Sequence, residues 1–505
     1  MMAIMLAGKL LGVLRDRLHG VMLGADTAEG IAFMQASLLP RTFLDIMFAS
    51  AFSASFIPVF NSYLETKDKK AAFDLAALFI SVVLALTAAF TVLCVIFAEP
   101  VYALFLGGDA LPAETAALGV KLLRVMFPLM ILSGLAFTLT GVLQSLGQFN
   151  IPAAMSVASN AVIILYYYFF LERFGVYGLC AAFLVGWALQ AAIQIPFLVK
   201  RKFKFKFNFN LKDPGLKKIA ALMLPAAAAS WAGPVNLLVN GKAVNMTGGP
   251  FDYNAIQYAN NLYAIASGVF VLAVANLVFP KFSRQAAAND AKGLSETLNE
   301  TLRGLVLFLV PLSAGLIALA RPIVKLVNEY GLFGEDATAV TSRALFWFSF
   351  GIVGYGLQIV LSRACYALRD GRTPVIASAV AIAINAAISF SLTPFIGIAG
   401  PTVASSVSIT AAGTILLASL YKKGYINFSK VSFYLLLKII LLCAAMLAVV
   451  LPCRNFFAAS LSDTVTNRVI NAAVPALAGA FVYVIGALLL KIKLPFAGAA
   501  QTFKG

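Results

Sequence analysis

The sequence predicts an all-α protein that crosses a membrane about fourteen times, each crossing needing ~20 apolar residues. Of its 505 residues, 61% are hydrophobic and only 12% are charged. A water-soluble fold of this length could not bury so much apolar surface, whereas a lipid bilayer can solvate it. Apolar runs of the length that spans a bilayer recur from one end of the chain to the other. We therefore expect a polytopic α-helical membrane protein without a large water-soluble domain.

The predicted spans follow one another with mostly short connections. Their cores are residues 4–24, 31–60, 72–97, 117–144, 151–171, 176–199, 217–243, 253–279, 302–320, 340–366, 374–394, 398–421, 432–452 and 469–490. We predict two pseudo-symmetric lobes of six helices each, two further helices and one linker. The boundaries are 1–199 for the N-terminal lobe, 200–216 for a basic cytoplasmic linker, 217–421 for the C-terminal lobe and 422–505 for the two additional helices.

The two lobes are predicted from an internal repeat. In each half, a proline opens an apolar helix, an asparagine follows further along it, and a short Gly-x-x-Gly turn comes next. These residues are Pro152, Asn160, Gly175 and Gly178 in the first half, and Pro374, Asn385, Gly397 and Gly400 in the second. Six predicted spans separate the two copies, so the repeat is parallel. Such a duplication is typical of transporters that have a cavity between two helix bundles.

The distribution of basic residues predicts the orientation of the chain. The formal net charge is +17, but the basic residues fall in alternate loops, as the positive-inside rule predicts, so we expect no nucleic-acid partner. The two most basic loops are ETKDKK, after the second span, and KRKFKFKFNFNLKDPGLKK, between the sixth and seventh. This pattern places both termini in the cytoplasm. In the longer loop, lysines alternate with phenylalanines, which suits contact with anionic membrane lipids.

The sequence contains no motif of an enzyme, a cofactor site or a metal site. The five cysteines are scattered through hydrophobic runs without metal-binding spacing, and one histidine, His19, makes no metal site and is expected to pack. P-loop, kinase and nucleophile-elbow motifs are absent. We therefore expect a non-enzymatic transporter without a cofactor, driven by an ion gradient, the membrane potential or the substrate gradient.

Charged side chains interrupt the first two predicted spans. The first span carries Lys9, Arg15 and Asp16, and the second carries Arg41. An ionisable group facing lipid costs at least about 2–3 kcal/mol, so such residues normally face a bundle interior or a water-filled cavity. The alternative is that those near span ends, Arg41 among them, reach the headgroups along their aliphatic stems. Arginine binds phosphate through two charge-assisted hydrogen bonds at once, so a lipid pyrophosphate would suit these cations.

Several segments together resemble one transporter family. They are LLGVLRDRLHGVMLGA near the N-terminus, YANNLYAIASGVFVLAVANLVFPKFS at 258–283, EYGLF at 329–333 and CYALRDGRTPV at 365–375. These segments resemble those of the MurJ (MviN) lipid II flippases, a family within the multidrug/oligosaccharidyl-lipid/polysaccharide exporter superfamily. The resemblance covers nearly the whole chain, including the two additional C-terminal helices.

The resemblance implies a function, a location and partners. It implies an alternating-access flippase that moves lipid II, the undecaprenyl-pyrophosphate-linked peptidoglycan precursor, across the bacterial cytoplasmic (inner) membrane. In the family, arginines of the first helix grip the pyrophosphate in a cavity between the lobes. On this sequence those positions fall on Lys9 and Arg15, with the neighbouring acid on Asp16. Proteins of cell-wall synthesis are further implied partners.

This sequence departs from the family at two positions in the cavity. The family arginine of the second helix falls near Leu44, with Arg41 one turn earlier as a substitute. An Asp-Arg pair of the eighth helix falls on Asn260 and Asn261, which keep hydrogen-bonding groups but lose the charges.

The sodium site of some family members would also fall on positions without a carboxylate, namely Asn240, Asn385 and Thr402, so sodium coupling is not expected. The expected cavity is thus less cationic than the family pattern. Three alternatives therefore stay open: a flippase for another lipid-linked polysaccharide unit, a small-molecule antiporter of the MATE type, and a scaffold for cell-wall enzymes that transports nothing.

Overall fold

The computed structural model of the protein describes residues 2–24, 26–47, 49–105, 111–230, 232–244, 246, 249, 251–427, 430–460 and 462–492. Within these ranges, side chains are described except at 2, 3, 5, 6, 44–47, 49–54, 224–230, 232–234, 269, 276, 280, 287, 430–433 and 460. The regular structure in these ranges is helical throughout. The all-α fold class predicted from the sequence is therefore confirmed.

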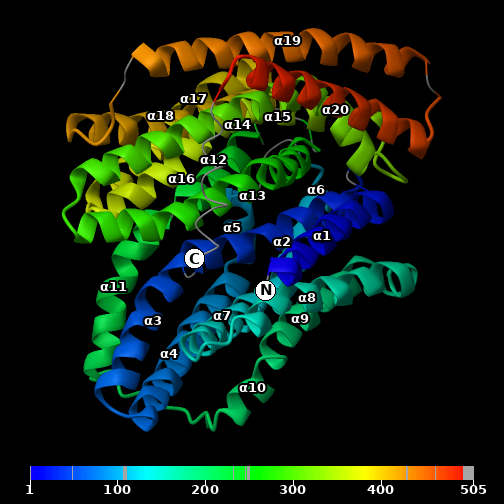
Figure 1. Ribbon diagram of the computed structural model, residues 1–505. Coiled ribbons are helices and arrows are strands. Elements are labelled where there is room, and N and C mark those ends of the chain that lie inside the picture. The colour runs from blue at the N-terminus through cyan, green and yellow to red at the C-terminus, as the bar shows by residue number, and fades with distance from the viewer. Residues whose placement is uncertain are drawn as a thin grey trace. The chain divides into compact units, whose positions relative to one another are not determined.

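The first of two compact units comprises Met1–Asn254 together with Tyr330–Phe333. Its helices, labelled in Figure 1, are α1 (Met2–Leu18), the π-helical turn η1 (His19–Gly24), α2 (Ala28–Met47), α3 (Ala49–Thr66), α4 (Lys69–Ile96), α5 (Ala98–Phe105), α6 (Ala113–Met126), α7 (Leu129–Ser145), α8 (Asn150–Phe169), α9 (Leu171–Ala192), α10 (Ile195–Lys200), α11 (Pro214–Ser230) and α12 (Ala232–Val244).

The second unit comprises Ala255–Glu329 and Gly334–Gly505. Its helices are α13 (Asp252–Ala287, whose first turn belongs to the first unit), α14 (Ala291–Asn328), α15 (Glu335–Ser349), α16 (Ile352–Ala367), α17 (Arg372–Ile396), α18 (Ala399–Lys422), α19 (Lys430–Ser460) and α20 (Val465–Leu489). Packing thus groups α11 and α12 with the first unit, where α11 lies against α3. The domain boundaries at 200–216 and 422 were drawn from the repeat in the sequence and not from packing. They stay a prediction.

The predicted spans coincide with the helices. Among the described residues, 10 helices are long and apolar enough to cross a membrane, or 11 if the bent pair α15 and α16 forms one span. These correspond to the predicted spans other than 4–24, 31–60 and 217–243. Those three fall on α1 with η1, on α2 with α3, and on α11 with α12.

Helix α1 approaches α8 closely because small residues form the contact. The two helices lie side by side in the first unit (Figure 1). A Cβ added at Gly8 would lie 2.1 Å from the Ser156 Oγ of α8, and one at Gly12 would lie 3.6 Å from the Asn160 amide nitrogen. Small residues four apart allow membrane helices to approach in this way. The consequence is that Arg15, which follows Gly12 by three residues on α1, is held against α8.

The two Gly-x-x-Gly turns of the repeat have the same backbone conformation. Gly175 has φ 56° and ψ −154°, and Gly397 has φ 60° and ψ −137°. This combination is essentially restricted to glycine because a Cβ would clash with the backbone. The agreement between two positions 222 residues apart, counting from 175 to 397, supports the predicted duplication.

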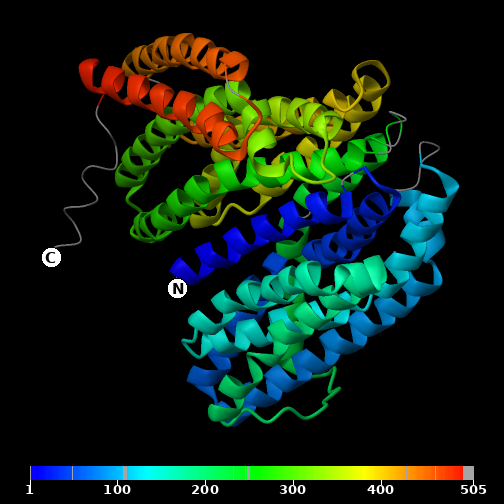
Figure 2. The ribbon, with the colours of Figure 1, turned by 90° about the vertical axis from the view of Figure 1, so that its right-hand side faces the viewer.

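The two C-terminal helices are attached to the second unit along α14. In Figure 2, α19 (orange) and α20 (red) run beside each other. An apolar cluster joins the three helices and contains Leu307, Ala318, Leu319, Ile439, Leu442, Cys443, Met446, Val450, Tyr483, Ala487 and Ile492. The Tyr483 hydroxyl also donates a hydrogen bond to the Leu307 carbonyl at 2.7 Å. Polar and apolar contacts therefore both fix α20 on α14.

A second attachment lies at the other end of α14. The Asn299 side chain donates to the Tyr425 carbonyl at 3.2 Å and accepts from the Asn427 amide at 3.2 Å. These bonds hold the connection between α18 and α19 against the first turns of α14. With 38 residues, α14 is longer than a membrane span requires.

Candidate functional site

Arg15 is the charged residue of α1 that is most firmly held in place. Its Nε and Nη2 donate to the Asp16 Oδ1 at 2.9 and 2.7 Å, and its Nη1 donates to the Asn160 Oδ1 at 3.0 Å. The side chains of Arg15 and Asp16 are only 16% and 28% exposed. The guanidinium also lies 5.8 Å from the ring centroid of Phe183, a favourable cation–π contact.

Asn160 links Arg15 to the helix contact described above. Its buried amide accepts from Arg15 and donates to the Gly8 carbonyl at 3.1 Å. The amide is therefore bonded on both its oxygen and its nitrogen, which fixes its orientation. Gly8 permits this bond because it lets the α1 backbone come close to α8. Asn160 is recognisable in the sequence as part of the repeat, but its role beside Arg15 was not predicted.

Arg15 lines a cavity of about 410 Å³ within the first unit. The second guanidinium in its wall belongs to Arg41, an exposed residue of α2. The other lining residues are polar or aromatic for the most part and come largely from α7, α8 and α9. They are Phe137, Thr140, Gln144, Phe149, Pro152, Ala153, Met155, Ser156, Ser159, Asn160, Ile163, Phe183, Trp187 and Gln190.

A polar pair that was not predicted from the sequence adjoins the cavity, which Thr140 lines. Thr140 of α7 donates to the Gln194 side chain at 3.2 Å, and the Gln194 amide donates to the Ala136 and Gln190 carbonyls, each at 3.0 Å. The signal in the sequence is the spacing: Thr140 with Gln144, and Gln190 with Gln194, are pairs four residues apart inside apolar segments. Residues at this spacing share one face of a helix.

The predicted site residues are only partly brought together. Arg15, Asp16 and Arg41 lie at or beside the cavity. Lys9 is exposed on α1 and is not among the described lining residues. Asn260 and Asn261 are half-buried on α13, in the second unit.

His19 and Arg17 are not among the described residues that line the cavity. His19 is buried in η1, where its Nδ1 lies 3.1 Å from the Tyr167 hydroxyl, and its ring lies 5.3 Å from that of Phe33. This is the packing environment expected for it. Arg17 lies over the Tyr330 ring, 3.9 Å from its centroid. The Leu44 side chain lies outside those described.

The arrangement can bind an anion with defined geometry. A guanidinium has five N–H donors. Three of those of Arg15 are directed to Asp16 and Asn160, which leaves one N–H on each terminal nitrogen. Two such donors match two oxygens of a phosphate group. Arg41 adds a second positive charge, and Asp16 offsets one of the two, so the site remains positive.

Comparison with known proteins identifies the family. The sequence profile of the family described as "Lipid II flippase MurJ" matches residues 21–469. A "Probable lipid II flippase MurJ" of Vibrio cholerae is 27% identical over 482 residues, covering 93% of this chain and 91% of the relative. A "Lipid II flippase MurJ" of Burkholderia cenocepacia is 27% identical over 426 residues, covering 83% of this chain and 82% of the relative.

Solved structures show the same fold. The structure titled "Lipid II flippase MurJ, inward closed conformation" has a TM-score of 0.81 at 23% identity and covers 97% of this chain and 99% of its own. An inward-facing multidrug resistance MATE family transporter has a TM-score of 0.71 at 15% identity. The match covers 83% of this chain and 95% of the transporter chain. The match to the MurJ structure includes the C-terminal region, whereas the match to the MATE transporter leaves more of this chain unmatched. Because the profile match extends over most of the sequence, the chain belongs to the lipid II flippase MurJ family.

Proposed function

We propose that this protein is a flippase that moves lipid II, a peptidoglycan precursor linked to a lipid by pyrophosphate, across the bacterial inner membrane. The relatives that match most of its length are named for lipid II. The observation in the molecule that carries the proposal is the Arg15 guanidinium, which lines a cavity with polar and aromatic walls and has two N–H donors left for a ligand. A pyrophosphate diester has two negative charges and closely spaced oxygens, which suit Arg15 and Arg41 together.

In this proposal, each residue of the site has a separate role. Arg15 binds one phosphate, and Asp16 and Asn160 hold the guanidinium in the required orientation before the ligand arrives. Arg41, which is more exposed, contacts the second phosphate. Lys9 raises the local positive potential from a greater distance. Preorganised donors of this kind lower the cost of ordering side chains on binding.

Transport then proceeds by alternating access of the site to the two membrane faces. A hinge in α13 at Ser267 and Gly268 would ease the change between the two states. The Ser267 hydroxyl donates to the Tyr263 carbonyl one turn earlier at 2.7 Å, a bond that competes with regular helix bonding and favours bending. An alanine at Gly268 would meet no heavy atom within 4 Å, so the position has room to move.

The proposed orientation has both termini in the cytoplasm. It is supported by the segment between α10 and α11, in which Lys202, Lys204 and Lys206 are exposed. A concentration of exposed lysines favours the cytoplasmic side of a membrane protein. Asparagines in place of the family's charged pair at Asn260 and Asn261 make another lipid-linked polysaccharide unit the second candidate substrate.

Complementation and reconstitution test the proposal. The wild-type chain is expected to support growth of bacteria depleted of their own lipid II flippase. Reconstituted in vesicles, it should move labelled lipid II between leaflets. Arg15→Ala is expected to lower the rate at least about tenfold, because a charge-assisted hydrogen bond contributes about 1.5–3 kcal/mol. Arg173→Ala, at an exposed arginine of α9 outside the cavity, is the matched control and should transport normally.

The outcomes separate the candidate functions. Arg15→Ala with an unchanged rate refutes the phosphate-binding role. Transport of a different undecaprenyl-linked glycan, without transport of lipid II, assigns the second candidate. Uptake of cationic drugs driven by a proton or sodium gradient would identify an antiporter of the MATE type.

A further inference from the structure

A second polar pocket, of about 490 Å³, lies within the second unit. It is formed by the C-terminal ends of α14 and α19, the connection that follows α19, and the first two turns of α20. Four basic side chains line it: Arg321, Lys325, Arg454 and Arg468. Among the described lining residues there is one carboxylate, that of Asp463. The proposed transport function does not use this pocket.

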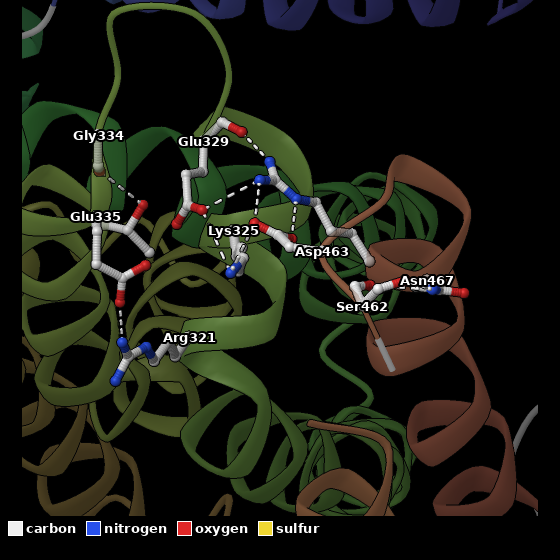
Figure 3. A network of polar contacts seen from close by, with 10 residues as sticks. Arg321, Lys325, Glu329, Gly334, Glu335, Ser462, Asp463 and Asn467 are labelled. Atoms are coloured by element: carbon white, nitrogen blue, oxygen red, sulfur yellow. Dashed lines mark hydrogen bonds and ion pairs between the residues drawn. The ribbon is translucent and has the colours of Figure 1, made fainter. Parts of the chain in front are cut away.

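Two of the four cations share their carboxylate partners, as Figure 3 shows for Lys325, Glu329 and Asp463. Lys325 Nζ lies 3.2 Å from the Asp463 Oδ2 and 3.4 Å from the Glu329 Oε1. Arg468 contacts both oxygens of Asp463 at 2.7 Å and the Glu329 Oε1 at 3.2 Å. These two cations and two carboxylates therefore balance each other in charge.

The remaining two cations differ from each other. Arg321 forms an ion pair with Glu335, which the close view also shows (Figure 3). Arg454 instead donates to neutral oxygens: its Nη1 to the Ala318 carbonyl at 2.7 Å, and its Nε and Nη2 to the Asn455 Oδ1 at 3.1 and 2.9 Å. Within the described residues, no carboxylate is in ion-pair contact with Arg454. The pocket therefore has one positive charge in excess.

The hydrogen bonds of Arg454 fix its plane without using all of its donors. Three of its five N–H groups are directed to Ala318 and Asn455, which leaves one on each terminal nitrogen. This is the same donor arrangement as that of Arg15. A guanidinium held in this way keeps one donor on each terminal nitrogen, and guanidinium donors suit a phosphate or a carboxylate. A hydrated lysine ammonium would bind the same anions with less geometric selectivity.

The surroundings of the pocket favour a ligand attached to a lipid. Phe457 lines it, and the neighbouring Phe456 is 65% exposed. Val465 and Val469, in the first turns of α20, are also exposed. In a membrane protein, apolar side chains beside charged groups at helix ends mark the boundary between hydrocarbon and headgroups. The Asn471 amide oxygen, buried in the pocket wall, lacks a partner in the described residues, and a headgroup hydroxyl could donate to it.

We propose that this pocket binds the phosphate of an anionic glycerophospholipid, with Arg454 as its main donor. The single negative charge of a phosphodiester matches the single positive charge in excess. A headgroup such as phosphoglycerol also has hydroxyl groups for the Asn471 amide. The acyl chains would lie against the exposed apolar residues of α19 and α20. With the termini in the cytoplasm, this end of α14 lies in the outer leaflet.

Lipid binding to the purified full-length protein tests the proposal. Native mass spectrometry of the protein in detergent, titrated with phosphatidylglycerol or phosphatidylcholine, counts the lipids retained. We expect retention of phosphatidylglycerol at lower concentration than phosphatidylcholine. Arg454→Gln should weaken phosphatidylglycerol binding about tenfold, the factor expected for loss of one charge-assisted hydrogen bond. Arg454→Lys keeps the positive charge but not the planar guanidinium. Its affinity for phosphatidylglycerol should lie between those of the wild type and Arg454→Gln.

Controls separate this site from general charge effects and from misfolding. Arg343→Gln removes an exposed arginine of α15 that does not line the pocket and should bind as the wild type does. Each variant is first compared with the wild type by size-exclusion chromatography. Asn471→Asp, which adds a negative charge to the pocket wall, provides a second test and should also weaken binding. Equal binding by the wild type, Arg454→Gln and Asn471→Asp overturns the proposal. Competition by inorganic phosphate at the same concentration as the lipid would assign the pocket to the free ion and overturn the lipid assignment.

Discussion

Arg15 of α1 and Asn160 of α8 form the polar contact on which the candidate site is built. The Arg15 Nη1 donates to the Asn160 Oδ1 at 3.0 Å, and the Asn160 amide returns a hydrogen bond of 3.1 Å to the Gly8 carbonyl, on the helix of Arg15. The position of a charge in the cavity wall thus depends on the packing of two helices.

Replacing Asn160 should impair transport without removing a charge. Asn160→Ala leaves Arg15 with one oriented partner, Asp16, so the guanidinium becomes less ordered and transport of lipid II should fall several-fold. Asn385, which occupies the equivalent position of the repeat and donates to Ser405 at 3.3 Å, offers the matched control, Asn385→Ala. Flipping rates in vesicles, measured at equal protein incorporation, check the expectation. Equal losses in both variants would indicate a general packing effect instead.

The repeated glycine turns should be intolerant of side chains. Gly175→Ala and Gly397→Ala each place a Cβ in a backbone conformation that L residues avoid, at a cost of about 1–3 kcal/mol. Gly315→Ala, in the interior of α14, meets no heavy atom within 4 Å and should be neutral or stabilising by up to about 1 kcal/mol. The melting temperature in detergent should therefore fall in the two turn variants and not in Gly315→Ala. A melting temperature unchanged in both turn variants would contradict the backbone argument.

Stability should depend on pH through Asp463. Hydrogen bonding by Arg468, aided by Lys325 and opposed by partial burial, lowers the pKa of the Asp463 carboxyl from 3.8 to about 2. Because the pKa is lower in the folded state, the carboxylate stabilises the fold above about pH 4, and this contribution is lost as the pH falls through about 2. Its size is at most about 1 kcal/mol, since the side chain is half exposed.

Melting temperatures of the wild type and Asp463→Asn, measured from pH 6 to pH 2, check this dependence. The wild type should melt higher at pH 6, and the difference should shrink towards pH 2. A melting-temperature difference that stays constant from pH 6 to pH 2 would show that the ion pairs of Asp463 with Arg468 and Lys325 contribute nothing to the pH dependence of stability.

The hinge proposed in α13 can be tested at Gly268. Gly268→Ala should stabilise the helix by up to about 1 kcal/mol, because it removes backbone freedom without a clash. If bending at this position accompanies transport, the same substitution should slow flipping while leaving lipid II binding unchanged. Gly315→Ala again serves as the control. A faster rate in the Gly268 variant would argue against a hinge there.

Much of the fold could be predicted from the sequence because membrane helices have a strong local signal. A span needs about twenty apolar residues whatever its neighbours are, so hydropathy alone locates it. The repeat was visible for a similar reason, since the conformation of Gly175 and Gly397 excludes other residues. These properties depend on local sequence and are readable without knowledge of tertiary contacts.

The site was less predictable because it depends on which helix faces meet. Lys9 and Arg15 are both cations in one apolar segment, but at 100° per residue they lie about 120° apart around α1. Arg15 lines the cavity and Lys9 is exposed. Gln194 and Thr140 could be recognised as polar residues in apolar segments, but their mutual hydrogen bond follows from the packing of α7 against the turn between α9 and α10. Tertiary contacts of that kind are not encoded in a single periodic pattern.

The length of α14 has a consequence for how the C-terminal helices are retained. At 1.5 Å per residue its 38 residues extend about 57 Å, nearly twice the hydrocarbon thickness of a bilayer. Asn299, which holds the connection before α19, precedes the predicted span 302–320 and is expected outside the hydrocarbon, whereas most of the apolar cluster is expected within it. A detergent that strips the annular lipids weakens only one of these two anchors, so the C-terminal hairpin should remain docked after delipidation.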